Sequence, residues 1–305
     1  MQGRFDRLFR GGPPAESGAA PVARRWRSPD GLSLHARDFA GAAGPARLPV
    51  ICLHGLTRNS RDFEGLAPAI AASGRRVLAL DVRGRGDSER DPNPLNYNPA
   101  VYAGDVIALM SEAGLSRAVF VGTSMGGLIT MTLASLRGDL VAGAVLNDIG
   151  PEIDPAGLAR IGGYVGAAAP AASWTEAARR SREINGQALP HLTEADWMTF
   201  ARRTWRELEP GRLVPDYDPA IAQAFATPAG PAPDLWPLFI GMAVGRPLML
   251  VRGAATDLLS AETAARMQSL APQMRRIDLA DIGHAPTLDE PEARAAILDF
   301  LAEAP

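Results

Sequence analysis

Short, wholly apolar runs alternate with longer amphipathic runs along the first half of this chain. The apolar runs are rich in Val, Ile, Leu and Ala, which is typical of strands buried on both faces of a sheet. The amphipathic runs repeat apolar residues at helical spacing, and two of them stop at a glycine. The pattern predicts strands at residues 49–53, 76–80, 117–121 and 141–146, and helices at 62–73, 100–113 and 128–136. This alternation predicts a mostly parallel sheet with helices on both faces.

Two further strand-like runs precede this series. Residues 22–27 and 32–39 are separated by Ser28-Pro29-Asp30-Gly31. The dipeptide Asp-Gly between two strand-like runs is a strong signal for a β-hairpin. We therefore expect a hairpin before the parallel part of the sheet.

The alternation of strand-like and helix-like runs ends near Pro151. Residues 151–232 contain helix-like runs and no buried strand, so we interpret them as a helical cap inserted after the sixth core strand. Strand and helix patterns then return at 246–252, 261–270, 276–279 and 292–302. The expected organisation is a flexible segment at 1–21, a core of 22–150 and 233–305, and the cap at 151–232. Three tryptophans of the cap either line an apolar acyl pocket or simply hold the cap together: Trp174, Trp197 and Trp205.

The segment Gly122–Gly127 lies between a predicted strand and a predicted helix. Its glycines flank Ser124 in the spacing G-x-S-x-G, which in this context is typical of a nucleophile elbow. A turn this tight leaves no room for side chains beside the serine. It raises the Ser124 hydroxyl above the sheet and directs the start of a helix at it.

A serine hydroxyl needs a neighbouring base, and the base needs an orienting carboxylate. Among the four histidines, His35, His54, His191 and His284, only His284 lies in a loop after the last predicted strand. We predict His284 as the base. Asp257 and Asp148 both follow predicted strands, where open α/β sheets place their sites. Asp257 is favoured because it precedes the histidine by one strand–loop unit, and Asp148 stays the alternative.

Acyl transfer also needs donors for the oxyanion. The backbone N–H of Met125 starts the helix after the serine, and that of Leu56 lies in the turn after the strand at 49–53. We expect these two groups to form the oxyanion hole. We expect His54, in the same turn, to hold the loop by hydrogen bonds.

Other chemistry finds little support in the sequence. The glycine-rich loop Asp81–Ser88 matches neither a dinucleotide fingerprint nor a P-loop, so we interpret it as a turn held by Asp81 and Arg83. No group of His, Cys, Asp and Glu has the sequence spacing of metal ligands. We expect no cofactor and no metal. The single cysteine, Cys52, lies in an apolar strand and is expected to be buried.

Composition limits the partners. The chain has 305 residues, of which 47% are hydrophobic and 21% charged, with a formal net charge of −3. This balance is that of a globular protein and gives no reason to expect a nucleic acid or an anionic membrane as partner. Residues 1–21 lack the apolar stretch of a secretory signal, and no run is long enough to span a membrane. We expect a cytoplasmic location; the oligomeric state is open.

Taken together, these motifs resemble the α/β-hydrolase superfamily. The matching elements are His54-Gly55, the D-x-R-G-x-G-x-S loop at 81–88, the serine elbow, the late Asp257 and the G-H-x-P segment at 283–286. The resemblance implies an α/β-hydrolase fold and a Ser–His–Asp triad. The segment Ser124-Met125-Gly126-Gly127 is equally similar to that of capped esterases and to that of C–C hydrolases of meta-cleavage pathways.

Serine at the elbow argues against haloalkane dehalogenases and epoxide hydrolases, which carry aspartate there. The charged turn at 58–62 departs from the glycine-rich loop of many C–C hydrolases and favours ester hydrolysis. We therefore predict cleavage of a small or medium carboxylic ester through an acyl-enzyme. The alternatives are a C–C hydrolase using Arg202 and Arg203 for a substrate carboxylate, a lactonase, or a non-catalytic ligand-binding protein of this fold.

Overall fold

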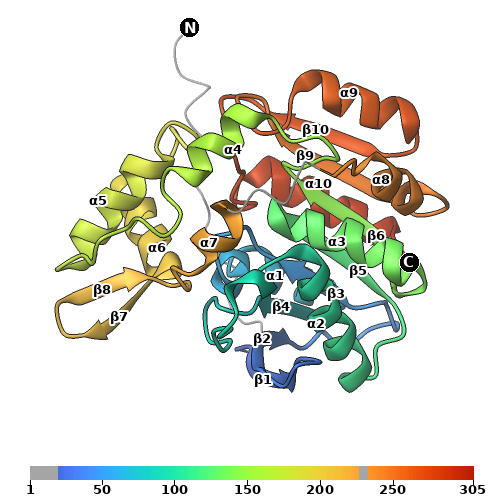
Figure 1. Ribbon diagram of the computed structural model, residues 1–305. Helices are drawn as coiled ribbons and strands as arrows, with labels where there is room; N and C mark the ends of the chain where they lie inside the picture. The colour runs from blue at the N-terminus through green and yellow to red at the C-terminus, as the bar shows by residue number, and fades with distance from the viewer. Residues whose placement is uncertain (1–19, 227–232) are drawn as a thin grey trace, which may run out of the picture.

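The computed structural model describes residues 20–226 and 233–305 (Figure 1). The segment expected to be flexible, residues 1–21, therefore lies almost wholly outside the described residues, as does the end of the expected cap, residues 227–232. No helix in the described ranges is long and apolar enough to cross a membrane.

An eight-stranded sheet forms the centre of the molecule, in the order β1-β2-β4-β3-β5-β6-β9-β10. Its strands are β1 (Val22–Arg27), β2 (Ser33–Phe39), β3 (Val50–Leu53), β4 (Val77–Asp81), β5 (Ala118–Thr123), β6 (Val141–Asn147), β9 (Leu248–Gly253) and β10 (Arg275–Leu279). The β1–β2 hairpin is antiparallel, as is the pairing of β2 with β4, and all other pairs are parallel. The predicted hairpin and mostly parallel sheet are both confirmed.

Two layers of helices cover the sheet (Figure 1). Helices α1 (Leu66–Ala72) and α10 (Pro291–Glu303) pack on one face. The opposite face is covered by α2 (Pro99–Glu112), α3 (Met125–Leu136), α8 (Trp236–Ala243) and α9 (Ala261–Leu270). Successive residues of β3 enter opposite layers, Ile51 on the α3 side and Cys52 on the α1 side. This is why the core strands are apolar at every position, and Cys52 is fully buried as predicted.

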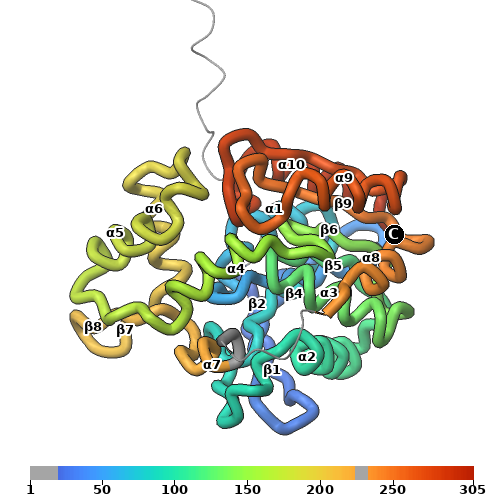
Figure 2. Tube along the Cα trace, turned by 45° about the horizontal axis from the view of Figure 1, so that its top comes forward, coloured from blue at the N-terminus to red at the C-terminus, as the bar shows by residue number. Residues whose placement is uncertain are grey.

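The chain leaves the core after β6 and returns at α8. Between them lie α4 (Pro155–Gly162), α5 (Trp174–Asn185), α6 (Glu194–Thr204), β7 (Trp205–Glu209), β8 (Arg212–Pro215) and α7 (Ile221–Ala226). Figures 1 and 2 both show α5, α6 and the β7–β8 hairpin standing to one side of the sheet, with α4 between them and the core.

The β7–β8 hairpin adds two short strands to the region where we expected helix-like runs and no buried strand. The two strands pair antiparallel around Gly211, whose φ of +78° suits a tight turn. Apart from Trp205 and Leu213 their side chains are largely exposed and often charged, so no apolar run marks them. The available signal was the turn dipeptide Pro210-Gly211.

Candidate active site

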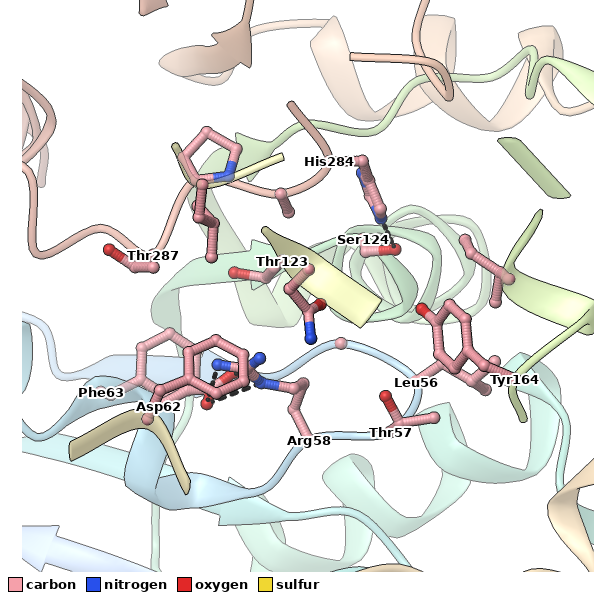
Figure 3. Close-up of a pocket in the computed structure, with 17 residues that line it drawn as sticks. Leu56, Thr57, Arg58, Asp62, Phe63, Thr123, Ser124, Tyr164, His284 and Thr287 are labelled. Atoms are coloured by element: carbon pink, nitrogen blue, oxygen red, sulfur yellow. Dashed lines mark hydrogen bonds and ion pairs between the residues drawn. The ribbon is translucent and has the colours of Figure 1, made fainter. Parts of the chain in front are cut away.

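A small cavity of about 70 Å³ opens at the carboxyl ends of β3 and β5. Its lower wall is the turn after β3, from Gly55 to Arg58, and Ser124 lies opposite (Figure 3). The loop of His284 closes one side. Residues of the region between β6 and α8 close the other: Ile161, Tyr164, Asn185, Leu189 and Phe200.

Ser124 occupies a sharp turn between β5 and α3. Its φ is +51°, a region that non-glycine residues rarely adopt. The two flanking glycines are required by space: a Cβ on Gly122 would lie 2.5 Å from the carbonyl carbon of Gly126, and one on Gly126 would lie 2.0 Å from the carbonyl oxygen of Leu53. The crowded turn directs the serine side chain out of the sheet and into the cavity.

Ser124 and His284 form the first link of a hydrogen-bonded chain. The imidazole Nε2 lies 2.9 Å from the Ser124 Oγ (Figure 3), and Nδ1 lies 2.8 Å from Oδ2 of Asp148. The carboxylate of Asp148 is fully buried and the His284 side chain is 8% exposed. Serine, imidazole and carboxylate thus stand in the order that nucleophilic catalysis requires.

Asp148 is the first residue after β6, and its own φ is +53°. Its carboxylate accepts hydrogen bonds from the Gly253 N–H at 2.9 Å and the Thr256 hydroxyl at 2.6 Å. Asp148 follows β6, whereas both donors come from the neighbouring strand β9 and the loop after it. The carboxylate is therefore held by β9 as well as by its own strand. A buried carboxylate with this many donors is oriented before any substrate arrives.

The structure does not bring Asp257 to His284, which corrects our choice between the two acids. Asp257 instead pairs with Arg160 of α4, with nitrogen–oxygen distances of 2.5 and 2.9 Å. The hydrogen bond from Arg160 lowers the pKa of the Asp257 carboxyl. The physical reason is placement. Asp148 directly follows the strand beside β5, whereas Asp257 follows β9, one strand further out, after a three-residue spacer.

The loop that carries His284 is held from two sides. The Asn147 side-chain amide donates to the Pro286 carbonyl at 2.9 Å and to the Thr123 hydroxyl at 3.0 Å. On the other side the Gly283 N–H donates to the Ala188 carbonyl at 2.7 Å. Sequence reasoning did not single out Asn147, although its place at the end of a strand beside the elbow strand was a usable signal.

The turn after β3 carries Leu56, which lines the same cavity as Ser124 (Figure 3). Met125 begins α3 directly after the serine, so its N–H belongs to the unpaired first turn of that helix. The close approach of the turn to the elbow is shown by Gly55, where an added Cβ would lie 3.8 Å from the Ser124 Cβ. Both expected oxyanion donors therefore belong to segments that border the serine.

His54 is held inside this turn. Its ring is fully buried, with Nδ1 2.7 Å from the Gly55 carbonyl, while Nε2 accepts from the Val82 N–H at 3.1 Å. Burial lowers the pKa of His54 to about 4. The neutral ring thus ties the turn after β3 to the end of β4.

Acid should destabilise the fold through His54. The unfolded chain binds a proton at an ordinary histidine pKa, whereas folded His54 binds it only near pH 4. Stability is therefore lost as pH falls from about 6.5 to about 4, by roughly 3 kcal/mol from this group alone. Urea unfolding at a series of pH values should show this slope in the wild type and a shallower one in His54→Asn, and parallel curves for the two proteins would contradict it.

The loop at 81–88 is a hydrogen-bonded scaffold. The Asp81 carboxylate accepts from the N–H groups of Ser60 and Asp87 and lies 2.7 Å from His35 Nδ1. Within the described residues, His35, Asp81 and Asp87 also form a group close enough to share a metal ion. Because the Asp81 oxygens are already engaged by three donors, hydrogen bonding accounts for the cluster and we assign no metal to it.

The two arginines that the alternative of a C–C hydrolase would use for a substrate carboxylate, Arg202 and Arg203, do not line the cavity. Arg203 pairs with Asp289 and Glu64, and the Arg202 guanidinium stacks 3.9 Å from the Trp174 ring centroid. None of the three cap tryptophans lines the cavity beside Ser124. Trp205 lines a neighbouring cavity of about 50 Å³, together with residues of α5 and α6 such as Ser181 and Phe200.

Comparisons with known proteins identify the family and the fold. The sequence profile of the alpha/beta hydrolase fold matches residues 49–291. A 3-hydroxybutyrate-oligomer hydrolase from Cupriavidus necator is 35% identical over 291 residues, 90% of this chain and 94% of that protein. A 2-(acetamidomethylene)succinate hydrolase from Mesorhizobium japonicum is 28% identical over 272 residues, 88% of this chain and 92% of that protein.

Among solved structures, an alpha/beta hydrolase from Novosphingobium aromaticivorans superposes with a TM-score of 0.87 and 46% identity, covering 94% of this chain and 99% of that one. The mostly parallel sheet, the serine elbow and these similarities over most of the chain lead to one conclusion: this chain belongs to the α/β-hydrolase family and is a hydrolase.

Proposed function

We propose that this protein is a serine hydrolase that cleaves small carboxylic esters through an acyl-enzyme. The observation that carries the proposal is the hydrogen-bonded chain Ser124–His284–Asp148, with links of 2.9 and 2.8 Å, opening on a cavity. Such a chain converts a weakly nucleophilic hydroxyl into a reactive one.

The proposed reaction proceeds in two halves. His284 takes the proton of Ser124 as the serine Oγ bonds to the ester carbonyl carbon, and the carbonyl oxygen becomes an oxyanion facing the N–H groups of Leu56 and Met125. The ester C–O bond then breaks, and His284 returns the proton to the departing alcohol. A water molecule, deprotonated by His284, then adds to the acyl carbon; the bond from that carbon to Ser124 Oγ breaks, His284 returns the proton to the serine oxygen, and the carboxylic acid leaves. Asp148 keeps the imidazole oriented and stabilises its protonated form throughout.

We also propose that residues 151–232 act as a cap that shapes the substrate site. The walls contributed by α4 and α6 include Ile161 and Phe200, and the free space beside the serine is small. A confined site of this kind favours a short acyl group. The full-length similarity to an enzyme named for oligomers of a hydroxy acid supports an ester substrate, since such oligomers are joined by ester bonds.

A substrate class that depends on Arg202 or Arg203 receives no support, because both side chains are engaged away from the cavity. This removes the sequence argument for a C–C hydrolase that uses them. A lactone is a cyclic ester and falls within the proposed chemistry.

Labelling with a fluorophosphonate and a chain-length series of p-nitrophenyl esters, from acetate to palmitate, test the proposal together. We expect one label per chain, located on the peptide that contains Ser124, and turnover that is highest for short acyl chains because the cavity is small. Ligand binding without labelling or turnover would instead indicate a non-catalytic protein of this fold. Turnover that rises steadily to palmitate would contradict the proposed size limit.

A further inference from the structure

Two neighbouring arginines in the loop after β4 are almost completely buried but differ in their partners. Arg83 is surrounded by carboxylates, with ion pairs to Asp30, Asp91 and Asp105. Arg85 is 1% exposed, and no carboxylate of the described residues lies within 4 Å of its guanidinium. Burying a cation without a counter-charge is energetically unfavourable. The burial of Arg85 therefore suggests that its side chain has a role.

The contacts found for the Arg85 guanidinium among the described residues are all with neutral groups. Its Nη1 donates to the Arg83 carbonyl at 2.8 Å and to the Tyr102 hydroxyl at 2.9 Å. The ring centroids of Tyr97 and Tyr102 lie 5.5 and 5.2 Å from the Arg85 Cζ. Aromatic faces and hydroxyl oxygens solvate a planar cation without cancelling its charge.

The remaining contacts reach the two segments that border Ser124. Nε donates to the Leu56 carbonyl at 3.0 Å, and Nη2 lies 3.5 Å from the Met125 Sδ. One rigid guanidinium therefore touches both the residue in the turn after β3 and the first residue of α3. These are the residues whose N–H groups we assign to the oxyanion.

The backbone of Arg85 is fixed independently of its side chain. Its N–H donates to the Val82 carbonyl at 3.0 Å, and the residue forms an antiparallel bridge with Tyr217. The next N–H in the chain, of Gly86, donates to the Asp216 carbonyl. The guanidinium thus has a firm base from which to hold the Leu56 turn.

We propose that Arg85 is a positioning residue for the oxyanion hole: it fixes the Leu56 turn against the start of α3 and places an unneutralised positive charge behind both oxyanion donors. The inference rests on the proposed function. Its physical basis is that donors and charges fixed in a water-poor site stabilise a developing anion far more than they stabilise a neutral ester. The contribution should therefore appear in the transition state and not in substrate binding.

The test compares Arg85→Met and Arg85→Lys with the wild type. For Arg85→Met we expect kcat on the best p-nitrophenyl ester to fall by about 10- to 100-fold, less than the loss of a direct oxyanion donor, with KM changed by less than about threefold. Arg85→Lys keeps the charge and should recover a substantial part of this loss. Arg83→Lys is the matched control, because it perturbs an equally buried arginine of the same loop and should lower the melting temperature without lowering kcat per folded enzyme.

Two inhibitors of the same carbon skeleton separate positioning from structure. A trifluoromethyl ketone adds to the serine and forms an oxyanion, whereas the corresponding secondary alcohol only occupies the cavity. We expect Arg85→Met to weaken the ketone by the same factor as kcat/KM and to leave the alcohol unchanged. Equal weakening of both inhibitors, or no weakening of either in a folded variant, would overturn the inference.

The fluorophosphonate labelling rate distinguishes failure of this inference from failure of the proposed function, since labelling does not depend on the identity of the substrate. A wild type that labels at Ser124, with Arg85 variants that label equally fast, removes only the role of Arg85. A wild type that is not labelled removes the proposed function and the role of Arg85 with it. Should Arg85→Met fail to fold, the same comparison is made with Arg85→Lys, which we expect to label more slowly than the wild type.

Discussion

Ser124→Ala is expected to reduce ester turnover by about 10⁴- to 10⁶-fold while the protein stays folded. The hydroxyl is the atom that bonds to the substrate in the proposed reaction, and no other described side chain replaces it against His284. Its removal should leave the fold intact because the Ser124 side chain makes no capping hydrogen bond to α3. Steady-state kinetics on the best p-nitrophenyl ester and a thermal melt measure both effects.

Thr132→Ala is the matched control for this experiment. It deletes a hydroxyl from α3, the helix that follows Ser124; Thr132 donates to the Leu128 carbonyl and does not line the cavity beside Ser124. We expect wild-type kinetics from it. Residual turnover of Ser124→Ala within about tenfold of the wild type would exclude Ser124 as the nucleophile, given the size of the expected loss.

The sheet and the elbow could be predicted because their signals are local. A strand covered on both faces must be apolar at every position, as β3 is, and this leaves a recognisable run in the sequence. The elbow likewise depends on adjacent residues, since Gly122 and Gly126 are required by the backbone that surrounds Ser124 itself. The core strands and the elbow are therefore each determined by a segment of a few residues.

The choice of acid is a non-local property. Asp148 and Asp257 both follow core strands, and nothing in their immediate sequence says which strand lies beside β5. That order comes from how the strands assemble. The same holds for Thr256, which donates to Asp148 across 108 positions of sequence.

The contacts of Arg85 are a second feature that the sequence alone does not predict. The motif at 81–88 indicates a tight turn, and Asp81 and Arg83 do hold it. The sequence does not reveal that Arg85 points the other way, toward Leu56 and Met125. Contacts between two loops that start from different strands depend on the finished sheet.

Asp148→Asn and Asp257→Asn should separate the two carboxylates by their effects on kcat. Asp148→Asn is expected to lower kcat by about 10³- to 10⁴-fold, because an amide in place of the carboxylate favours the wrong histidine tautomer and no longer stabilises the imidazolium. It should also lower the melting temperature, since the fully buried Asp148 accepts hydrogen bonds from Gly253 and Thr256.

Asp257→Asn should change kcat by less than about threefold, because the carboxylate is 38% exposed, pairs with a partly exposed Arg160 and does not line the cavity beside Ser124. Its main effect should be on the attachment of α4 to the core, which Arg160→Gln would reproduce. Both variants are compared at equal folded fraction, measured by circular dichroism. A loss in Asp257→Asn as large as that in Asp148→Asn, without the same loss in Arg160→Gln, would mean that Asp257 itself takes part in the reaction and that Asp148 alone does not support His284.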